Sequence, residues 1–315
     1  ALAPLDSFPI DLMLRGAKFV LSATLMRARA RTLGYHTLSL RHLPFRSLPC
    51  FDYTLRVPMT ASQALGAPTI FDRLSQSRMQ WRYLDSSKMG RKGLISAIET
   101  LDPSTNFVFV YLHHIDMASH VFGIDSGLFW KTVSRTDRLV GQVVEKVTTR
   151  LGDPEVTIFS DHGMSTIRRQ VGLPRLLRHP GFPSRFCVAL DATMVRLWYL
   201  VEDHKLRAEV RGVVSESLPG RFLSQGDLES LHLDFRHRLY GDEIFLVEPG
   251  TAIFPNFHSY IRPKAMHAYH PDHPDQHGIV ITSPRNATQP VFQAVDIAPL
   301  CYRACGIAEP EADAR

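Results

Sequence analysis

Apolar residues occur along this chain either in short continuous runs or at helical spacing. The runs NFVFVYLHH (106–114) and EVTIFS (155–160) are short and mostly apolar, as expected of strands buried in a parallel sheet. Between them, residues 126–150 place apolar side chains at helical spacing and stop before a Gly-Asp-Pro turn. This strand–helix–strand order predicts an α/β fold with a mostly parallel sheet flanked by helices.

The same patterns predict further elements on both sides of this unit. Helices are expected at 11–33, from 69 to 76, at 206–218 and at 295–306, and strands at 81–85, 187–200 (interrupted by Asp191), 243–249 and 278–283. Residues 180–250 lack the strand–helix–strand alternation, so we expect a smaller α+β region inserted there, beside the main sheet. Residues 1–315 are otherwise expected to form one domain.

Composition excludes several classes of protein. The 315 residues are 44% hydrophobic and 21% charged, with a net charge of +5, which is ordinary for a globular protein. No basic cluster is interleaved with aromatic residues, so nucleic-acid binding is not predicted. The four cysteines contain no CxxC pair, which argues against a disulfide framework or a zinc ribbon.

Targeting and assembly are not indicated by the sequence. No run reaches the roughly 20 apolar residues of a membrane span, and no signal peptide is present, so no cellular location is predicted. The chain begins with Ala, and we expect its natural beginning to lie upstream. Nothing in the sequence indicates an oligomeric state.

Acidic and imidazole side chains follow two of the predicted strands. Asp161 and His162 come directly after the run 155–160, and Asp116 and His120 follow the run 106–114. Parallel strands present their carboxyl ends at one edge of a sheet, where α/β proteins hold ligands and catalytic groups. Carboxylate oxygen with imidazole nitrogen is a donor set that suits Zn²⁺. The two pairs are therefore candidate metal ligands.

A third group of candidates lies before the predicted strand 278–283. The segment KAMHAYHPDHPDQHG contains four histidines, which cannot all be ligands: His267, His270, His273 and His277. Proline-interrupted His/Asp segments are often exposed turns, so the segment alone leaves both interpretations open. Together with the two pairs, it could complete two adjacent divalent metal centres, an arrangement that clamps a phosphoryl group.

Three segments carry a resemblance to a known family: YLHHIDMASHVFG (111–123), IFSDHGM (158–164) and MHAYHPD (266–272). They resemble motifs of the alkaline phosphatase superfamily, and more specifically of its type I phosphodiesterase/nucleotide pyrophosphatase branch. APTIFDRL (67–74) and VDIAP (295–299) are similar to secondary landmarks of that family. The resemblance implies an alkaline-phosphatase-like catalytic domain over residues 1–315.

The resemblance also implies a ligand set for two zinc ions. It assigns Asp116, His120 and His267 to one zinc and Asp161 with His162 to the other. The segment QHG (276–278) makes His277 an alternative to His267. Ala268 stands where the family usually has glycine in its HGY loop, which places a Cβ in that loop.

The chain departs from the family upstream of these motifs. Members have there a strand ending in a metal-binding Asp, followed by a Thr or Ser nucleophile, and no such pattern precedes residue 106. Thr24, Thr60 and Ser62 lack the surrounding motif, so the nucleophile is not identified. The second zinc is left with two ligands, whereas catalytic zinc normally has three. We therefore expect the N-terminal part of the core to be missing.

Three explanations compete for this departure: a fragment or split enzyme, a degenerate member that has lost catalysis, or direct attack by hydroxide at the metals without a protein nucleophile. The first is favoured because the other motifs are intact. The implied function is metal-dependent hydrolysis of a phosphodiester or phosphomonoester, with a small phosphate ester, such as a nucleotide, as substrate. The alternative is a non-catalytic pseudoenzyme or binding protein on the same fold.

Overall fold

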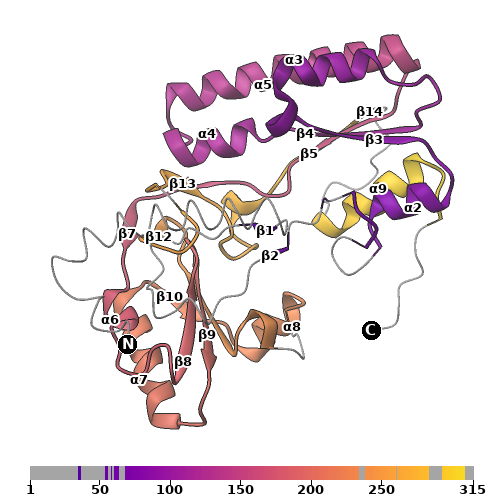
Figure 1. Ribbon diagram of the computed structural model, residues 1–315. Coiled ribbons are helices and arrows are strands. Elements are labelled where there is room, and N and C mark those ends of the chain that lie inside the picture. The colour runs from indigo at the N-terminus through magenta and orange to yellow at the C-terminus, as the bar shows by residue number, and fades with distance from the viewer. Residues whose placement is uncertain are drawn as a thin grey trace. The chain divides into compact units, whose positions relative to one another are not determined.

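The computed structural model describes residues 35–36, 54–55, 58, 60–63, 68–233, 238–259, 261–283 and 293–308. The chain forms two compact units (Figure 1). Unit 1 comprises Ala1–Arg56 and Met164–His277, and unit 2 comprises Val57–Gly163 and Gly278–Arg315. The helix predicted at 11–33 lies outside the described residues. Among the helices that are described, none has the length and hydropathy needed to cross a membrane.

Unit 2 contains the α/β arrangement expected from the sequence. Its strands are β3 (Trp81–Asp85), β4 (Phe107–Tyr111), β5 (Val156–Phe159) and β14 (Val280–Ser283), and its helices are α2 (Ile70–Gln76), α3 (Ser86–Glu99), α4 (His114–Phe122), α5 (Gly127–Leu151) and α9 (Ile297–Ala304). Strand β3 runs parallel to β4, and β14 runs antiparallel to β5. Figure 1 shows α3 and α5 side by side along β3 and β4.

Local sequence determines where the long helix α5 begins and ends. The Ser126 side chain accepts a hydrogen bond from the Phe129 backbone N–H at 3.1 Å, which satisfies a free donor of the first turn. Gly152, with φ 93°, ends the helix. Leu139 on the inner face joins a buried cluster with Leu94 of α3 and with Leu84, Ile98 and Leu101. This cluster fixes α3 and α5 against one face of the β3–β4 pair.

Strands β4 and β5 are less buried than the sequence predicts. Every residue of β5 is half-buried, as are those of β4 except Tyr111, which is exposed, so the expectation of fully buried strands is wrong. In the described part of the chain, β4 pairs only with β3 and β5 pairs only with β14, which leaves the other edge of each of these two strands less covered. On the face away from α3 and α5, Phe109 stacks on Tyr83 at 5.7 Å and meets Phe159 edge-on at 6.0 Å.

Unit 1 contains a separate antiparallel sheet with strand order β10-β11-β9-β8. These strands are β8 (Phe186–Leu190), β9 (Met194–Tyr199), β10 (Gly220–Phe222) and β11 (Glu243–Val247), and α7 (His204–Ser217) packs on the sheet. The predicted interruption at Asp191 is confirmed as the turn between β8 and β9, where the Asp191 N–H donates to the Met194 carbonyl at 3.0 Å. The sheet lies within the region 180–250 that we expected to differ from the rest.

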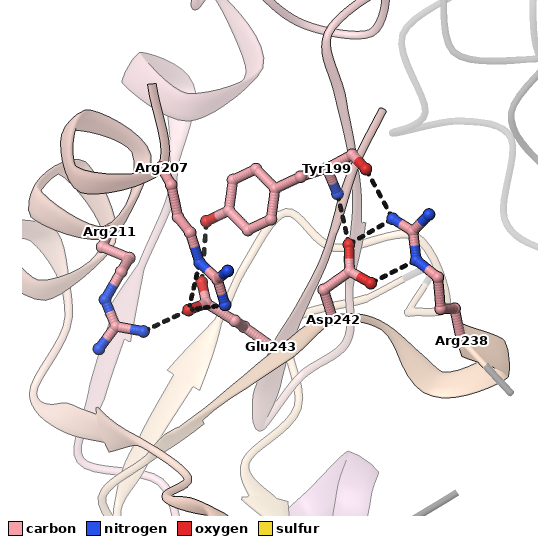
Figure 2. A network of polar contacts seen from close by, with 6 residues as sticks. All are labelled: Tyr199, Arg207, Arg211, Arg238, Asp242 and Glu243. Carbon is pink, nitrogen blue, oxygen red and sulfur yellow. Dashed lines mark hydrogen bonds and ion pairs between the residues drawn. The ribbon is translucent and has the colours of Figure 1, made fainter. Parts of the chain in front are cut away.

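A buried carboxylate ties this sheet to α7, as Figure 2 shows. The Glu243 side chain is only 8% exposed and accepts hydrogen bonds from Arg207 and Arg211 of α7. It also accepts from the Tyr199 hydroxyl at 2.8 Å. Burial, and then the Glu243 bond, raise the pKa of Tyr199. Two guanidinium groups compensate the single buried charge, so the network joins β9, β11 and α7.

Short elements complete the described part of unit 1. They are β1 (Tyr35–His36), β2 (Thr54–Leu55), β6 (Ser165–Thr166), β7 (Arg169–Val171), α6 (Pro174–Leu177), α8 (Gln225–Ser230), β12 (Thr251–Ile253) and β13 (Ala265–Met266). Single turns of 3₁₀ helix occur at Arg238–Tyr240 and Pro274–Gln276, and in unit 2 at Ala294–Asp296. Strand β13 pairs antiparallel with β6, and β12 pairs in parallel with β7.

Candidate metal centre

The end of β5 is held firmly by the segment that leads into β14. The Ser160 N–H donates to the Ile279 carbonyl at 3.0 Å, and the Ile279 N–H donates to the Ser160 hydroxyl oxygen at 2.9 Å. A Cβ added at Gly278 would lie only 2.5 Å from the Ser160 carbonyl oxygen, so glycine is needed for this close approach. The residue that precedes Asp161 is thereby fixed in place.

His162 is oriented for metal binding by a backbone carbonyl. Its Nδ1 lies 2.8 Å from the Gly163 carbonyl oxygen. Because a carbonyl can only accept, Nδ1 carries the hydrogen, and Nε2 is the ring nitrogen that would bind a metal ion. Nε2 lies 3.5 Å from Asp161 Oδ1, and the Asp161 side chain is 84% exposed. The two side chains therefore present one oxygen and one nitrogen donor beside each other.

Asp116 and His120 lie one turn apart on α4, which begins soon after β4 ends. His120 Nε2 is 3.2 Å from Asp116 Oδ1, and Asp116 lies in the first turn of the helix. A carboxylate in this turn interacts favourably with the amino end of the helix dipole. The spacing seen in the sequence thus produces a second carboxylate–imidazole pair.

The two pairs meet at the same edge of unit 2. A carboxylate oxygen of Asp116 and a ring nitrogen of His162 lie within 4.8 Å of each other. Zinc–ligand bonds are about 2.0–2.2 Å long, and the two ions of a two-metal site lie about 3.5–4 Å apart, so the two donor atoms are close enough to serve two adjacent ions. The expectation that strands β4 and β5 bring their acidic and imidazole side chains together is met for these two residues. The donor atoms fit a divalent metal.

Tyr111 and Asp85 belong to the same edge, although sequence reasoning did not select them. Asp85 ends β3 and lies directly opposite Tyr111, the last residue of β4. Burial raises the pKa of the Tyr111 phenol, and the carboxylates of Asp116, Asp161 and Asp85 raise it further. Three carboxylates of this edge therefore act on the phenol. The signal in the sequence was the shared position of both residues at strand ends.

His267 and His277 belong to unit 1, and their role as ligands stays a prediction. His267 follows β13 directly and precedes Ala268, whose φ of 66° is in the left-handed region that favours glycine. The loop is fixed by Gln276, whose side chain accepts from the Tyr269 N–H at 3.1 Å and donates to the Ser165 hydroxyl at 3.1 Å. His277 is exposed at the end of a 3₁₀ turn.

The other two histidines of this loop have local structural contacts. His270 Nδ1 accepts from the Asp272 N–H at 3.4 Å, and His273 Nδ1 accepts from the Asp275 N–H at 3.3 Å. These bonds stabilise tight turns. They agree with the interpretation of this part of the loop as polar turns.

The structure does not bring the described nucleophile candidates to this edge. The backbone N–H of Thr69 and then the Ser62 hydroxyl hold the pKa of Asp72 at about 2, so Ser62 supports the start of α2. Thr60 lines a cavity of about 490 Å³ with Trp81, at the amino end of β3, whereas the metal candidates lie at the carboxyl ends of the strands. Thr24 lies outside the described residues.

Comparison with known proteins gives one family and one fold. The family model of type I phosphodiesterase / nucleotide pyrophosphatase matches residues 34–269. Human ectonucleotide pyrophosphatase / phosphodiesterase 5 superposes with a TM-score of 0.64 at 14% identity, over 85% of this chain and 79% of that chain. The murine protein gives a TM-score of 0.61 at 14% identity, over 77% and 71%.

An inactive threonine-to-alanine variant of the murine protein, solved in complex with AMP, matches equally well, with a TM-score of 0.61 at 14% identity over 77% of this chain and 71% of that one. At this identity the likeness establishes the alkaline-phosphatase-like α/β fold and no finer property. No curated protein sequence matches the chain.

Proposed function

Because the chain belongs to the type I phosphodiesterase / nucleotide pyrophosphatase family, we propose that it is a metal-dependent hydrolase of phosphodiester or phosphomonoester bonds. The observation that carries the proposal is the approach of Asp116 to His162 within 4.8 Å at the carboxyl edge of unit 2. The substrate class we propose is a small phosphate ester, with nucleotides included because a protein of this fold was solved with AMP.

In this proposal five residues hold two divalent ions, most suitably zinc. Asp116, His120 and His267 hold one, Asp161 and His162 hold the other, and His277 is the alternative to His267. Bound zinc would supply positive charge to the phosphoryl oxygens and lower the pKa of an attacking hydroxyl or water. The imidazoles bind only as neutral rings, so acid weakens metal binding.

The remaining contributions come from the protein itself. The Gly163 carbonyl fixes the His162 ring in the tautomer that offers Nε2. Ser160 and Gly278 fix the backbone from which Asp161 and His162 project. Such fixed ligands need little reorganisation when a charged substrate arrives, which is the main source of electrostatic stabilisation in enzymes.

A second candidate function is phosphate-ester binding without turnover. It is favoured by one observation: Ser62, a described candidate nucleophile, supports the first turn of α2 instead of reaching the edge that bears Asp116. This candidate shares the metal ligands and differs only in the covalent step.

The test is hydrolysis of bis(4-nitrophenyl) phosphate by the full chain with added Zn²⁺. The proposal expects turnover that a chelator removes and that Asp116→Asn lowers at least ~100-fold, because a metal ligand is lost. Asp137→Asn on the exposed side of α5 is the matched control and should keep full activity. Zinc binding without turnover would favour the second candidate or a chain that lacks the nucleophile-bearing part of its core, and turnover unaffected by Asp116→Asn would contradict both candidates.

A further inference from the structure

A central strand of the sheet in unit 1 carries an arginine whose buried donor has no acceptor. Arg196 of β9 is half-buried, and its Nε atom is fully buried and makes no hydrogen bond. Among the described residues, no carboxylate forms an ion pair with its guanidinium group. Buried N–H groups in folded proteins are almost always paired, so this exception needs a physical explanation.

The pairing of the sheet determines what surrounds Arg196. Its neighbours along β9, Val195 and Leu197, are fully buried in the core that includes α7, so the Arg196 side chain points to the opposite face of the sheet. The residues directly opposite on the adjacent strands are Ala189 of β8 and Ile244 of β11. Directly opposite side chains share a face, and neither of these two offers an acceptor to the guanidinium.

The next side chains along β9 on this face are also uncharged. Met194 and Trp198 lie two residues before and two residues after Arg196, and residues two apart on a strand share a face. Both are half-buried. The Trp198 indole is fixed, because its Nε1–H donates to the Arg238 carbonyl at 2.6 Å. The guanidinium is therefore flanked on its own strand by a fixed aromatic ring and by a thioether.

Carboxylates elsewhere in this sheet and its loops are engaged by other arginines. Glu243 accepts hydrogen bonds from Arg207 and Arg211 (Figure 2). Asp227 forms an ion pair with Arg221 of β10. These pairs balance their own charges and leave the positive charge on β9 without a described counter-ion. An anion from outside the chain would satisfy both this charge and the buried donor.

We propose that Arg196 binds an oxyanion, a carboxylate or a phosphoryl group, whose attached apolar or aromatic body lies against Trp198 and Met194. A guanidinium presents its N–H donors in a planar fork that matches both kinds of oxyanion. An aromatic neighbour adds stacking area for the body of the ligand. The site uses none of the proposed metal ligands, so it does not depend on the proposed function.

The experiment is a magnetic resonance titration of the ¹⁵N-labelled full chain with acetate, benzoate and phenylphosphonate. The reporter is the indole N–H of Trp198, two residues from Arg196. Benzoate should produce a saturable shift and bind ~3-fold or more tighter than acetate, because its ring is buried. Arg196→Met should weaken binding ~10-fold or more, because a charge-assisted hydrogen bond is lost. Arg175→Met, which removes an exposed arginine of the same unit, is the matched control and should preserve the affinity.

Thermal unfolding distinguishes a ligand site from a purely structural role. Without any probe, Arg196→Met should leave the unfolding temperature unchanged or raise it, because the substitution removes a buried donor that lacks an acceptor. Arg211→Met removes a partner of the buried Glu243 carboxylate and should lower the unfolding temperature. Benzoate should raise the unfolding temperature of the unaltered chain and leave that of Arg196→Met unchanged.

The two oxyanion arms identify the ligand chemistry. A saturable response to benzoate alone would assign a carboxylate ligand, and a response to phenylphosphonate alone would assign a phosphoryl ligand. The proposal is overturned if no probe shifts the Trp198 signal, or if Arg196→Met binds the probes as tightly as the unaltered chain. A clear loss of stability in Arg196→Met without any probe would also overturn it, because the arginine would then serve the fold.

Discussion

Substitution of Gly278 by alanine should damage both the stability of unit 2 and its metal ligands. The new Cβ would lie 2.5 Å from the Ser160 carbonyl oxygen and 2.9 Å from its hydroxyl oxygen, whereas ordinary contacts begin at 3.4 Å. Ser160 or β14 must therefore retreat by about 0.9 Å, the difference between 3.4 and 2.5 Å. This movement stretches the two hydrogen bonds between Ser160 and Ile279.

The magnitude follows from these contacts. Overpacking of a tight site costs about 1–3 kcal/mol, and each of the two weakened hydrogen bonds costs about 0.5–1.5 kcal/mol, which gives a loss of roughly 2–6 kcal/mol in the free energy of unfolding. Displacement of Ser160 also moves Asp161, so zinc affinity should fall ~10-fold or more. Hydrogen exchange of β5 and β14 measures the local stability without presuming two-state unfolding of the whole chain.

Gly141→Ala is the matched control, because a Cβ at this position of α5 meets nothing within 4 Å. It replaces a glycine inside a helix and should stabilise unit 2 by about 0.5–1 kcal/mol. If Gly278→Ala exchanges as slowly as the unaltered protein and binds zinc equally well, the close approach at Ser160 has been misassigned.

Three further perturbations test other parts of the structure. Ala268→Gly should stabilise the chain by about 0.5–1 kcal/mol in urea unfolding, because the φ of 66° strains alanine; a loss would show that Ala268 is not left-handed. Glu243→Gln should destabilise unit 1 by about 1–3 kcal/mol in thermal unfolding. Glu216→Gln is the control, because Glu216 forms an ion pair in which both side chains are about two-thirds exposed, and it should change the stability of unit 1 little. Equal effects of the two substitutions would contradict the buried network. Burial, and then Cys305, raise the pKa of Cys301 to about 11, so this thiol should react slowly with a disulfide reagent at pH 8. Its contribution to stability should be present below pH 9 and lost as the pH rises toward 11. Labelling of the folded chain as fast as in urea would refute this.

Most of the described secondary structure follows from local patterns in the sequence. The run that contains Phe109 and the one that contains Phe159 are strands, and the helically spaced residues between them form α5. The helix α3 was not predicted. Gly90, with φ 63°, interrupts its helical dihedrals after the first turn, so the sequence shows no continuous helical pattern there.

The site was predictable in part, for a physical reason. Asp116 and His162 lie close together at one edge of unit 2. The sequence shows that each of them follows the carboxyl end of a predicted strand, where α/β proteins place ligands. The involvement of Tyr111 depends on its pairing with Asp85 across two strands, and register between distant segments cannot be read from composition. For the same reason, the half-burial of β4 depends on which strands lie beside it, and the sequence of β4 alone does not contain that information.

The most direct test of the central claim is zinc binding by the purified full chain at neutral pH, measured by calorimetry and by metal analysis. The account predicts at least one zinc per chain, with an affinity that His162→Ala lowers ~10-fold or more because a ligand held by the Gly163 carbonyl is lost. His204→Ala, at an exposed position in α7, should leave the affinity unchanged. A chain that binds no zinc, or one that binds it equally well without the His162 imidazole, would contradict the account.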